Sequence, residues 1–216
     1  TFVIGAYFGF RLYTVYFAPN VNASKEYLFI KTGGHLDDIY QEVKSKDLLK
    51  NVGSFSQAAA KMDLALAIKP GRYKLTKGMN NRTIINMIKA GNQDPVKLKF
   101  QNIRRKQEFA GYLSKSLEPD SMAFIALLDS TEYLSKQGFT TDNIYSMFIP
   151  NTYEFYWNTN AEDFMVKMKS EYDKFWTTER LNKAKALNLT AIQVSILASI
   201  VDAEAIYDKE MPIIAG

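Results

Sequence analysis

The residue best placed for acid–base chemistry is one carboxylate near the end of the chain, Glu204. It lies in an apolar stretch, residues 190–208, whose helical start is marked by Thr190 and Gln193, the two side chains of a capping box. At about 100° per residue, Glu204 shares a helix face with Leu197. A carboxyl group among aliphatic side chains loses hydration, which favours its protonated form, so Glu204 is expected to donate a proton to a leaving oxygen. The alternative is a Glu that simply reaches solvent at the end of the helix.

The opposite face of this helix carries a polar stripe formed by Ser195, Ser199 and Asp202. Asp202 lies about 160° around the helix from Glu204, so it is expected to point away from the apolar face. Reactions that need two carboxylates at one site are therefore not supported by this pair. Asp208, one turn beyond Glu204, is a candidate with no motif to support it.

The composition excludes several kinds of catalysis. The chain has 216 residues, of which 47% are hydrophobic, and this is enough for one or two folded domains. It has no cysteine, so disulfides, thiolate metal sites and a cysteine nucleophile are excluded. His35 is the only histidine and lies far from any serine motif, so a Ser-His-Asp triad is not expected. Catalysis must therefore come from carboxylates, hydroxyls, lysines or a metal with oxygen ligands.

The first 19 residues are aromatic and apolar, and they are expected to be the remnant of a membrane anchor. They are fewer than the ~20 residues that span a bilayer, and Arg11 interrupts them. Pro19 is expected to end the helix. A cleaved signal peptide and an element that packs on the core are the alternatives. Residues 20–25 are predicted to be a polar linker.

The next part of the chain, residues 20–93, is predicted to be a small α+β module. Strands are expected at 27–30 and 73–75, with two helical stretches between them and a third after the second strand. This order and size are those of a LysM-like module, a type that often holds aminosugar polymers, and the comparison is a fold-level analogy. The polar, turn-rich residues 91–95 are expected to end the module.

A cluster of basic residues follows the module. Its members are Lys97, Lys99, Arg104, Arg105 and Lys106. Nucleic-acid binding would require interleaved aromatic residues and a recognisable binding fold, and neither is evident in the sequence. The cluster is therefore expected to be a solvated surface, with an anionic membrane or polymer as the alternative partner. The formal charge of the chain, +4, suits an anionic partner without identifying it.

Aromatic residues gather in the segment 149–157, in a part of the chain that is otherwise mainly helical. Asn151, Tyr153 and Glu154 could line a sugar groove, because aromatic rings offer flat apolar faces beside polar handles. The alternation of Tyr153 with Phe155 is equally typical of a half-buried strand, whose rings belong to the core. The pattern alone leaves both interpretations open.

Two segments, taken together, resemble the motifs of a known family. Residues 149–157 are similar to one motif of the YceG-like endolytic murein transglycosylases, the MltG family, and residues 197–205 followed by 210–216 are similar to another. The resemblance implies an α+β fold with three parts. These are a membrane-anchor segment (1–19), a LysM-like module (20–93) and a mainly helical catalytic domain (94–216) that is incomplete at its C-terminal end.

The same resemblance implies roles for particular residues. The positions that match the family's motifs are the catalytic Glu204, the supporting Asp202, and the substrate-binding Asn151, Tyr153 and Glu154. Ala205 departs from the family pattern, in which a Thr or Ser usually follows the catalytic Glu. Any role of a hydroxyl group at that position is therefore absent here.

The reaction implied by the resemblance is cleavage of the β-1,4 bond between N-acetylmuramic acid and N-acetylglucosamine in peptidoglycan, which terminates glycan elongation. The strand is left with a 1,6-anhydro end because the sugar's own 6-hydroxyl attacks, and one Glu acts as acid and then as base. No cofactor and no metal are implied. The implied location is the inner (plasma) membrane, crossed once, with the catalytic domain facing the cell wall.

The expected partners are peptidoglycan glycan strands, the membrane, and proteins of cell-wall synthesis, with no nucleic acid. Two other functions are kept as alternatives. One is a peptidoglycan-binding or scaffold protein without catalysis, and the other is a muramidase that hydrolyses the same bond. The mass of the product separates the enzymes, since hydrolysis adds a water that the anhydro reaction does not.

Overall fold

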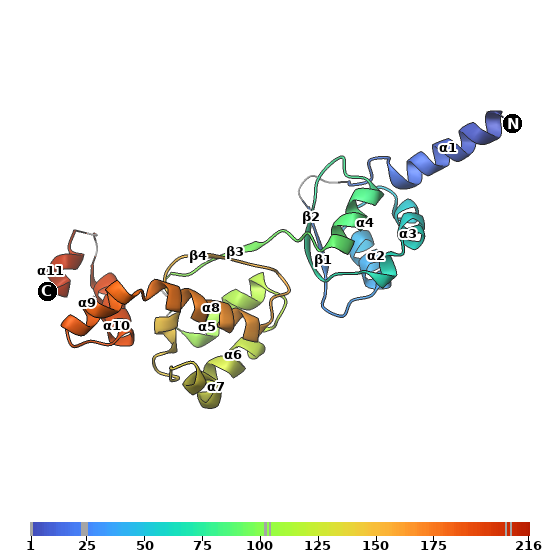
Figure 1. Ribbon diagram of the computed structural model, residues 1–216. Helices are drawn as coiled ribbons and strands as arrows, with labels where there is room; N and C mark the ends of the chain where they lie inside the picture. Colours follow the sequence, from blue (N-terminus) through green and yellow to red (C-terminus); the bar gives the residue numbers. More distant parts are fainter. Residues whose placement is uncertain (1, 23–25, 102, 104, 206, 208) are drawn as a thin grey trace. The chain divides into compact units, whose positions relative to one another are not determined.

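Figure 1 shows the computed structural model, which describes residues 2–22, 26–101, 103, 105–205, 207 and 209–216. The chain forms two compact units. Unit 1 comprises Thr1–Val96 and Glu154–Asn158, and unit 2 comprises Lys97–Tyr153 and Thr159–Gly216. Helices and two small sheets together give the mixed α+β class expected from the sequence.

The described residues of unit 1 form four helices, a short 3-10 helix and a two-stranded antiparallel sheet. In chain order its elements are α1 (Phe2–Tyr16), β1 (Glu26–Ile30), α2 (Leu36–Ser45), α3 (Val52–Lys61), η1 (Leu64–Leu66), β2 (Gly71–Leu75) and α4 (Asn81–Ala90). Gly91 ends α4 in the left-handed conformation (φ 75°), which a residue without a Cβ adopts at low cost.

The core of unit 1 forms between the sheet and the helices because both have an apolar face. In the sheet, Leu28 pairs with Tyr73, and both side chains are fully buried. The isoleucines Ile84, Ile85 and Ile88 of α4 are buried in the same core. On average each such aliphatic side chain contributes about 1.5–3 kcal/mol by leaving water.

The predicted linker after α1 is instead built into unit 1, except for residues 23–25, which lie outside the described residues. Pro19 and Val21 form isolated β-bridges to Asn80 and Leu49. The side chain of Asn20 is buried and belongs to a polar network. These residues look polar and turn-like in sequence, but hydrogen bonds to distant segments hold them in place.

The buried network joins the end of α1 to the starts of α3 and α4. Asn20 Nδ2 donates to Asn81 Oδ1 (2.7 Å), and Asn81 Nδ2 donates to the carbonyl oxygen of Val15 in α1 (2.8 Å). Asn20 Oδ1 accepts from the backbone N–H of Asn51 (2.8 Å), the N-cap of α3. Since Asn81 is fully buried, this junction is fixed and not a flexible hinge.

Beyond this junction α1 extends away from the rest of unit 1 (Figure 1). Its apolar side chains from Val3 to Tyr13 are exposed, with Val3, Phe10 and Tyr13 each more than half accessible. Arg11 is its only charged residue. No single helix within the described residues has both the length and the hydropathy to cross a bilayer. The successive helices α9 (Thr178–Ala186) and α10 (Ala191–Glu204) meet that criterion only as a pair bent by 78°.

The outer face of β1 is covered by side chains from other parts of unit 1. The ring of Trp157 lies edge-on to Phe29, with 5.0 Å between the ring centroids. The guanidinium of Arg72 lies 4.3 Å from the ring centre of Tyr27, and Lys46 Nζ lies 4.7 Å from that of Phe29. The segment 154–158 therefore completes unit 1, although it is far away in sequence.

We predict that Trp157→Ala lowers the free energy of unfolding of unit 1 by about 2 kcal/mol, because it removes an aromatic pair and uncovers Phe29. The matched control is Tyr156→Ala, since the neighbouring Tyr156 is exposed and its loss should change stability by less than about 0.5 kcal/mol. Urea unfolding followed by hydrogen exchange of β1 amides measures both. Equal effects of the two variants would contradict the structural role of Trp157.

A second prediction concerns Tyr73, whose ring is fully buried under the sheet and whose hydroxyl donates to the carbonyl of Lys69 (2.7 Å). Burial raises the pKa of Tyr73 to about 12. Because the unfolded chain ionises this group near pH 10, its contribution to stability is complete below pH 10 and is lost as the pH rises towards 12. The urea midpoint should fall over this range, and Tyr73→Phe should show a shallower decline. An identical pH dependence in both proteins would refute the prediction.

Unit 2 is mainly helical. Its elements are β3 (Val96–Lys99), α5 (Lys106–Ser116), α6 (Ser121–Asp129), α7 (Thr131–Lys136), the 3-10 helix η2 (Ile144–Met147), β4 (Thr152–Phe155), α8 (Ala161–Phe175), α9, α10 and α11 (Met211–Ala215). The strands β3 and β4 pair in the second two-stranded sheet, and the boundary between the units falls within both of them.

Aromatic rings form the centre of the core of unit 2. Phe100, which follows β3, packs edge-on against Phe109 of α5 at 5.3 Å and against Phe148 at 6.3 Å. Phe164 of α8 lies 6.1 Å from Phe100. Edge-to-face pairs of this kind add about 0.5–1.5 kcal/mol each to the burial of the rings.

The basic cluster before α5 is largely a solvated surface where the structure describes it, and Arg104 lies outside the described residues. Lys97 and Lys99 point outward from β3. Arg105 pairs with Glu108 (3.4 Å), and the half-buried Lys106 pairs with Asp129. Exposed ion pairs such as Arg105–Glu108 contribute little to stability.

Candidate functional site

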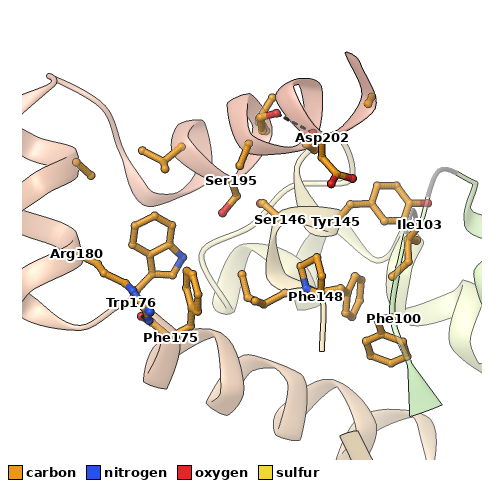
Figure 2. Close-up of a pocket in the computed structure, with 18 of the residues that line it drawn as sticks. Phe100, Ile103, Tyr145, Ser146, Phe148, Phe175, Trp176, Arg180, Ser195 and Asp202 are labelled. Atoms are coloured by element: carbon orange, nitrogen blue, oxygen red, sulfur yellow. Dashed lines mark hydrogen bonds between the residues drawn. The ribbon is translucent and has the colours of Figure 1, made fainter. Parts of the chain in front are cut away.

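Unit 2 contains a cavity of about 780 Å³ between α10 and an aromatic wall (Figure 2). The aromatic wall comes from the segment after β3, from η2 and its following loop, and from the end of α8. The rings and the guanidinium on this side are those of Phe100, Tyr145, Phe148, Phe175, Trp176 and Arg180. A cavity of this volume is large enough for a ligand of one or more sugar rings.

The aromatic wall is rigid because its rings are part of the core. Phe148 packs on Phe109, with 4.8 Å between ring centroids, and its backbone N–H donates to the carbonyl of Tyr145 (3.1 Å). Burial raises the pKa of Tyr145, an effect that Lys106 opposes. Tyr145 therefore presents a neutral hydroxyl beside apolar ring surface, a combination that suits a sugar.

The opposite wall is the polar face of α10. The helix begins as predicted, because Thr190 Oγ1 accepts from the N–H of Gln193 (3.2 Å) and Gln193 Oε1 accepts from the N–H of Thr190 (2.8 Å). Its phase then turns Ser195, Ser199 and Asp202 to the cavity. Figure 2 shows the hydroxyl of Ser195 and the carboxylate of Asp202 on this side.

The expectation that Glu204 lies among buried aliphatic side chains is wrong. Its side chain is exposed, and it is not among the residues that line the cavity. None of the described residues of α10 is buried, and Ile196, Leu197 and Ile200 are all more than 40% exposed. Ile196 of this apolar face lines the cavity, but among the described residues the face as a whole stays exposed, so the carboxyl group keeps its contact with water. Asp202, expected to point away, is the carboxylate that lines the cavity.

The structure separates the other predicted residues from the cavity. Tyr153 is buried at 7% exposure, and its hydroxyl donates to the carbonyl of Ile149 (2.7 Å). Burial, and secondarily the charge of Glu171, raise the pKa of Tyr153. Of the two interpretations left open by the sequence, the core strand is correct for this ring.

Asn151 and Glu154 are exposed, and neither lines the cavity. Asn151 has a structural role, because its carbonyl accepts from the N–H of Phe100 (2.9 Å) and its Oδ1 accepts from the N–H of Thr152 (2.7 Å). The same motif still reaches the cavity through its first residues, Ile149 and Pro150. Asp208, the other candidate carboxylate, lies outside the described residues.

Two cavity residues at the α8–α9 corner were not predicted from the sequence. The indole Nε1 of Trp176 is buried and has no hydrogen-bond partner among the described residues. The guanidinium of Arg180 lies 4.0 Å from the ring centre of Phe175 and donates to that residue's carbonyl (2.6 Å). No acidic side chain within the described part of the chain pairs with Arg180, so its charge is available to an anionic ligand. The only signal in the sequence was the pair of aromatic residues that ends α8.

Acidic and histidine side chains do not gather elsewhere in a way that would hold a metal. Within the residues that the structure describes, no group of three or more His, Asp or Glu side chains is close enough to bind one. Among the cavity-lining residues that the structure describes, Asp202 is the only one with a carboxylate. The chemistry that this site can support directly is proton transfer by a carboxylate together with stacking on aromatic rings.

The fold and this pair of motifs define a YceG-like protein. The model of the YceG-like family matches residues 28–216, and the chain belongs to that family. The crystal structure of a YceG-like protein from Listeria monocytogenes is similar, with a TM-score of 0.50 and 18% sequence identity. The similarity covers 87% of this chain and 67% of the Listeria chain, and at that identity it shows a shared fold. Among curated proteins, none matches this chain significantly.

Proposed function

We propose that this YceG-like protein is an endolytic murein transglycosylase attached to a membrane. It would cleave the β-1,4 bond between N-acetylmuramic acid and N-acetylglucosamine inside peptidoglycan strands and leave 1,6-anhydro ends, which stops elongation of the strand. The observation that carries the proposal is that the 197–205 motif and the cavity meet on one helix. Asp202 and Ala203 lie within that motif and also line the cavity.

The proposed catalytic residue is Glu204, one residue beyond the part of α10 that lines the cavity. A glycan strand bound in the cavity and continuing past the end of α10 would displace water from Glu204. The acid then donates its proton to the glycosidic oxygen as that bond breaks. The resulting carboxylate takes the proton of the sugar's 6-hydroxyl while the 6-oxygen bonds to the anomeric carbon, so no water is added.

The cavity supplies binding groups for such a strand. Tyr145 and Phe148 offer ring surface to the apolar faces of sugars, and Asp202 can accept hydrogen bonds from sugar hydroxyls. Arg180 lies at the same cavity with a charge suited to the carboxylate of a muramyl group or its peptide. Asn151, Tyr153 and Glu154 then act through the fold of their strand and not by direct contact in this cavity.

Attachment to a membrane is proposed on the exposed apolar surface of α1. A helix that is apolar on all sides is normally covered by a protein core or by lipid. The described part of unit 1 packs only against the last turn of α1 and leaves the turns before it exposed. The proposed location is the inner (plasma) membrane with unit 2 facing the cell wall. Proteins of cell-wall synthesis are natural partners there, because they make the strands that this enzyme would cut.

The test is incubation of the full-length protein with purified sacculi, followed by mass spectrometry of the released glycans. The proposal expects fragments with 1,6-anhydro ends and internal chain cleavage. Products heavier by one water would show a muramidase instead. No products from a folded full-length protein would reject both enzymatic assignments.

A second candidate, a peptidoglycan-binding protein without catalysis, is favoured by a groove in unit 1. The groove has a volume of about 470 Å³ and lies between the turn after β1 and the residues around η1. The exposed Leu66 lines it together with Gly33 and Gly34, which gives an apolar surface beside a turn without side chains. In the same assay this function predicts that the protein sediments with sacculi and releases nothing.

A further inference from the structure

We propose that the end of unit 1 from which α1 emerges is a docking surface for the anionic headgroups of a lipid bilayer. This basal surface is formed by Lys50, Lys77 and Arg82 around the last turn of α1. The inference rests on the proposed attachment of α1 to a membrane. It adds that unit 1 itself lies against the headgroups and is not suspended from α1 by a flexible linker.

The first step is that the basal surface cannot move independently of α1. Asn81 Nδ2 donates to the carbonyl of Val15 in α1. Asn81 Oδ1 accepts from the side-chain amide of Asn20, which lies shortly after the end of α1. Both asparagine side chains are buried, and Val15 and Tyr16 pack against the core of unit 1. If lipid surrounds α1, residues at the level of its last turn are therefore held at the membrane surface.

The second step is that three exposed cations lie at this level. The guanidinium of Arg82 lies 5.6 Å from the ring centre of Phe17, the residue that follows α1. The backbone N–H of Lys50 donates to the carbonyl of Asn20 (2.8 Å). Lys77 lies two residues before Met79, whose carbonyl accepts from the N–H of Asn20 (2.9 Å). None of these three cations has an acidic partner among the described residues.

The third step is that acidic residues are missing from all the segments that meet here. Residues 1–22, 48–60 and 76–92 contain lysine and arginine but no Asp or Glu. The nearest acid in sequence is Asp47, whose Oδ2 accepts from the side chain of Asn22 (2.6 Å). The N-termini of α3 and α4, capped by Asn51 and Asn80, add the positive ends of two helix dipoles. The basal surface therefore carries an excess of positive charge, as an anionic partner requires.

The fourth step distinguishes a bilayer from an acidic protein. A protein groove covers one face of an apolar helix and leaves the others wet, whereas lipid covers all faces. In α1, Val3, Tyr7, Phe8, Leu12 and Tyr13 point in different directions and are all more than half exposed. The apolar helix α1 suits the acyl chains of a bilayer, and the cations fixed around its last turn suit the anionic headgroups.

The experiment uses the full-length chain with neutral phosphatidylcholine vesicles and with vesicles that also contain phosphatidylglycerol. Flotation gives the partition coefficient for each. A triple variant, Lys50→Gln with Lys77→Gln and Arg82→Gln, tests the basal surface. The matched control is Lys31→Gln with Lys61→Gln and Lys115→Gln, which removes the same charge from other exposed positions. Each juxtamembrane cation raises partitioning to an anionic bilayer about fivefold, so the triple variant should lose about a hundredfold on anionic vesicles only.

Position is measured separately from affinity. Because the chain has no cysteine, Thr83→Cys beside Arg82 gives a single labelling site, and Lys61→Cys at the far end of α3 gives its control. A fluorophore at position 83 should be quenched by headgroup-labelled lipid in anionic vesicles, and one at position 61 should not. Binding to neutral vesicles with neither a charge effect nor quenching at 83 would overturn the basal surface. Absence of binding to both kinds of vesicle would overturn the membrane attachment itself.

Discussion

Glu204→Gln lowers the release of anhydro-ended glycans by about a thousandfold or more, because an amide can neither give nor take the proton that the reaction requires. The fold is expected to be unchanged, since the side chain is exposed. The measurement compares initial rates of product release by the wild type and the variant on the same sacculi. Equal unfolding curves for the two proteins exclude loss of structure as the cause.

The matched control for this prediction is Asp202→Asn, on the same helix. Asp202 lines the cavity and is assigned to substrate binding, so its amide should still accept hydrogen bonds and activity should fall only about tenfold. The effect should appear mainly in KM, whereas Glu204→Gln should act on kcat. If Asp202→Asn abolished activity and Glu204→Gln did not, the acid would be the carboxylate of the cavity wall and the motif-based assignment would be wrong.

Asn81→Leu destabilises unit 1 by about 3 kcal/mol, the second large effect that we expect. The leucine has a similar volume, but it removes the donor to the carbonyl of Val15 and the acceptor for one of the two N–H groups of the Asn20 side-chain amide. Urea unfolding measures the loss, and hydrogen exchange should show faster opening at the C-terminal turn of α1.

The control is Asn86→Leu, one turn further along α4. Asn86 is exposed, so the same chemical change there should alter stability by no more than about 0.5 kcal/mol. If both variants unfolded at the same urea concentration, the network would not hold α1, and the fixed junction beneath the basal surface would lose its support.

Local patterns predicted most of the elements. The capping box at Thr190 and Gln193 marks the start of α10, and Gly91 marks the end of α4, because each signal depends only on neighbouring backbone groups. The prediction of a polar linker after α1 is wrong because the structure of this segment depends on distant residues. Asn20 is buried by partners 31 and 61 residues away, and no local pattern reveals such partners.

The candidate site was less accessible to prediction. Helical periodicity correctly places Glu204 and Asp202 on different faces of α10, but it does not reveal which face meets another element. The cavity is formed by segments from Phe100 to Met211, and its unpredicted members Trp176 and Arg180 lie at a corner between helices. Their proximity to α10 follows from tertiary packing, which the spacing of residues within one helix cannot encode.

The contact between Phe29 and Trp157 has a consequence for folding of the chain during its synthesis on the ribosome. Translation proceeds from the amino end, and most domains become complete as soon as their last residue has emerged. The segment 154–158 that covers β1 is made only after residues 97–153 of unit 2, so unit 1 stays incomplete while unit 2 is being synthesised. A protein truncated after Val96 would consequently lack Trp157, and Phe29 of β1 would lose the ring that covers it.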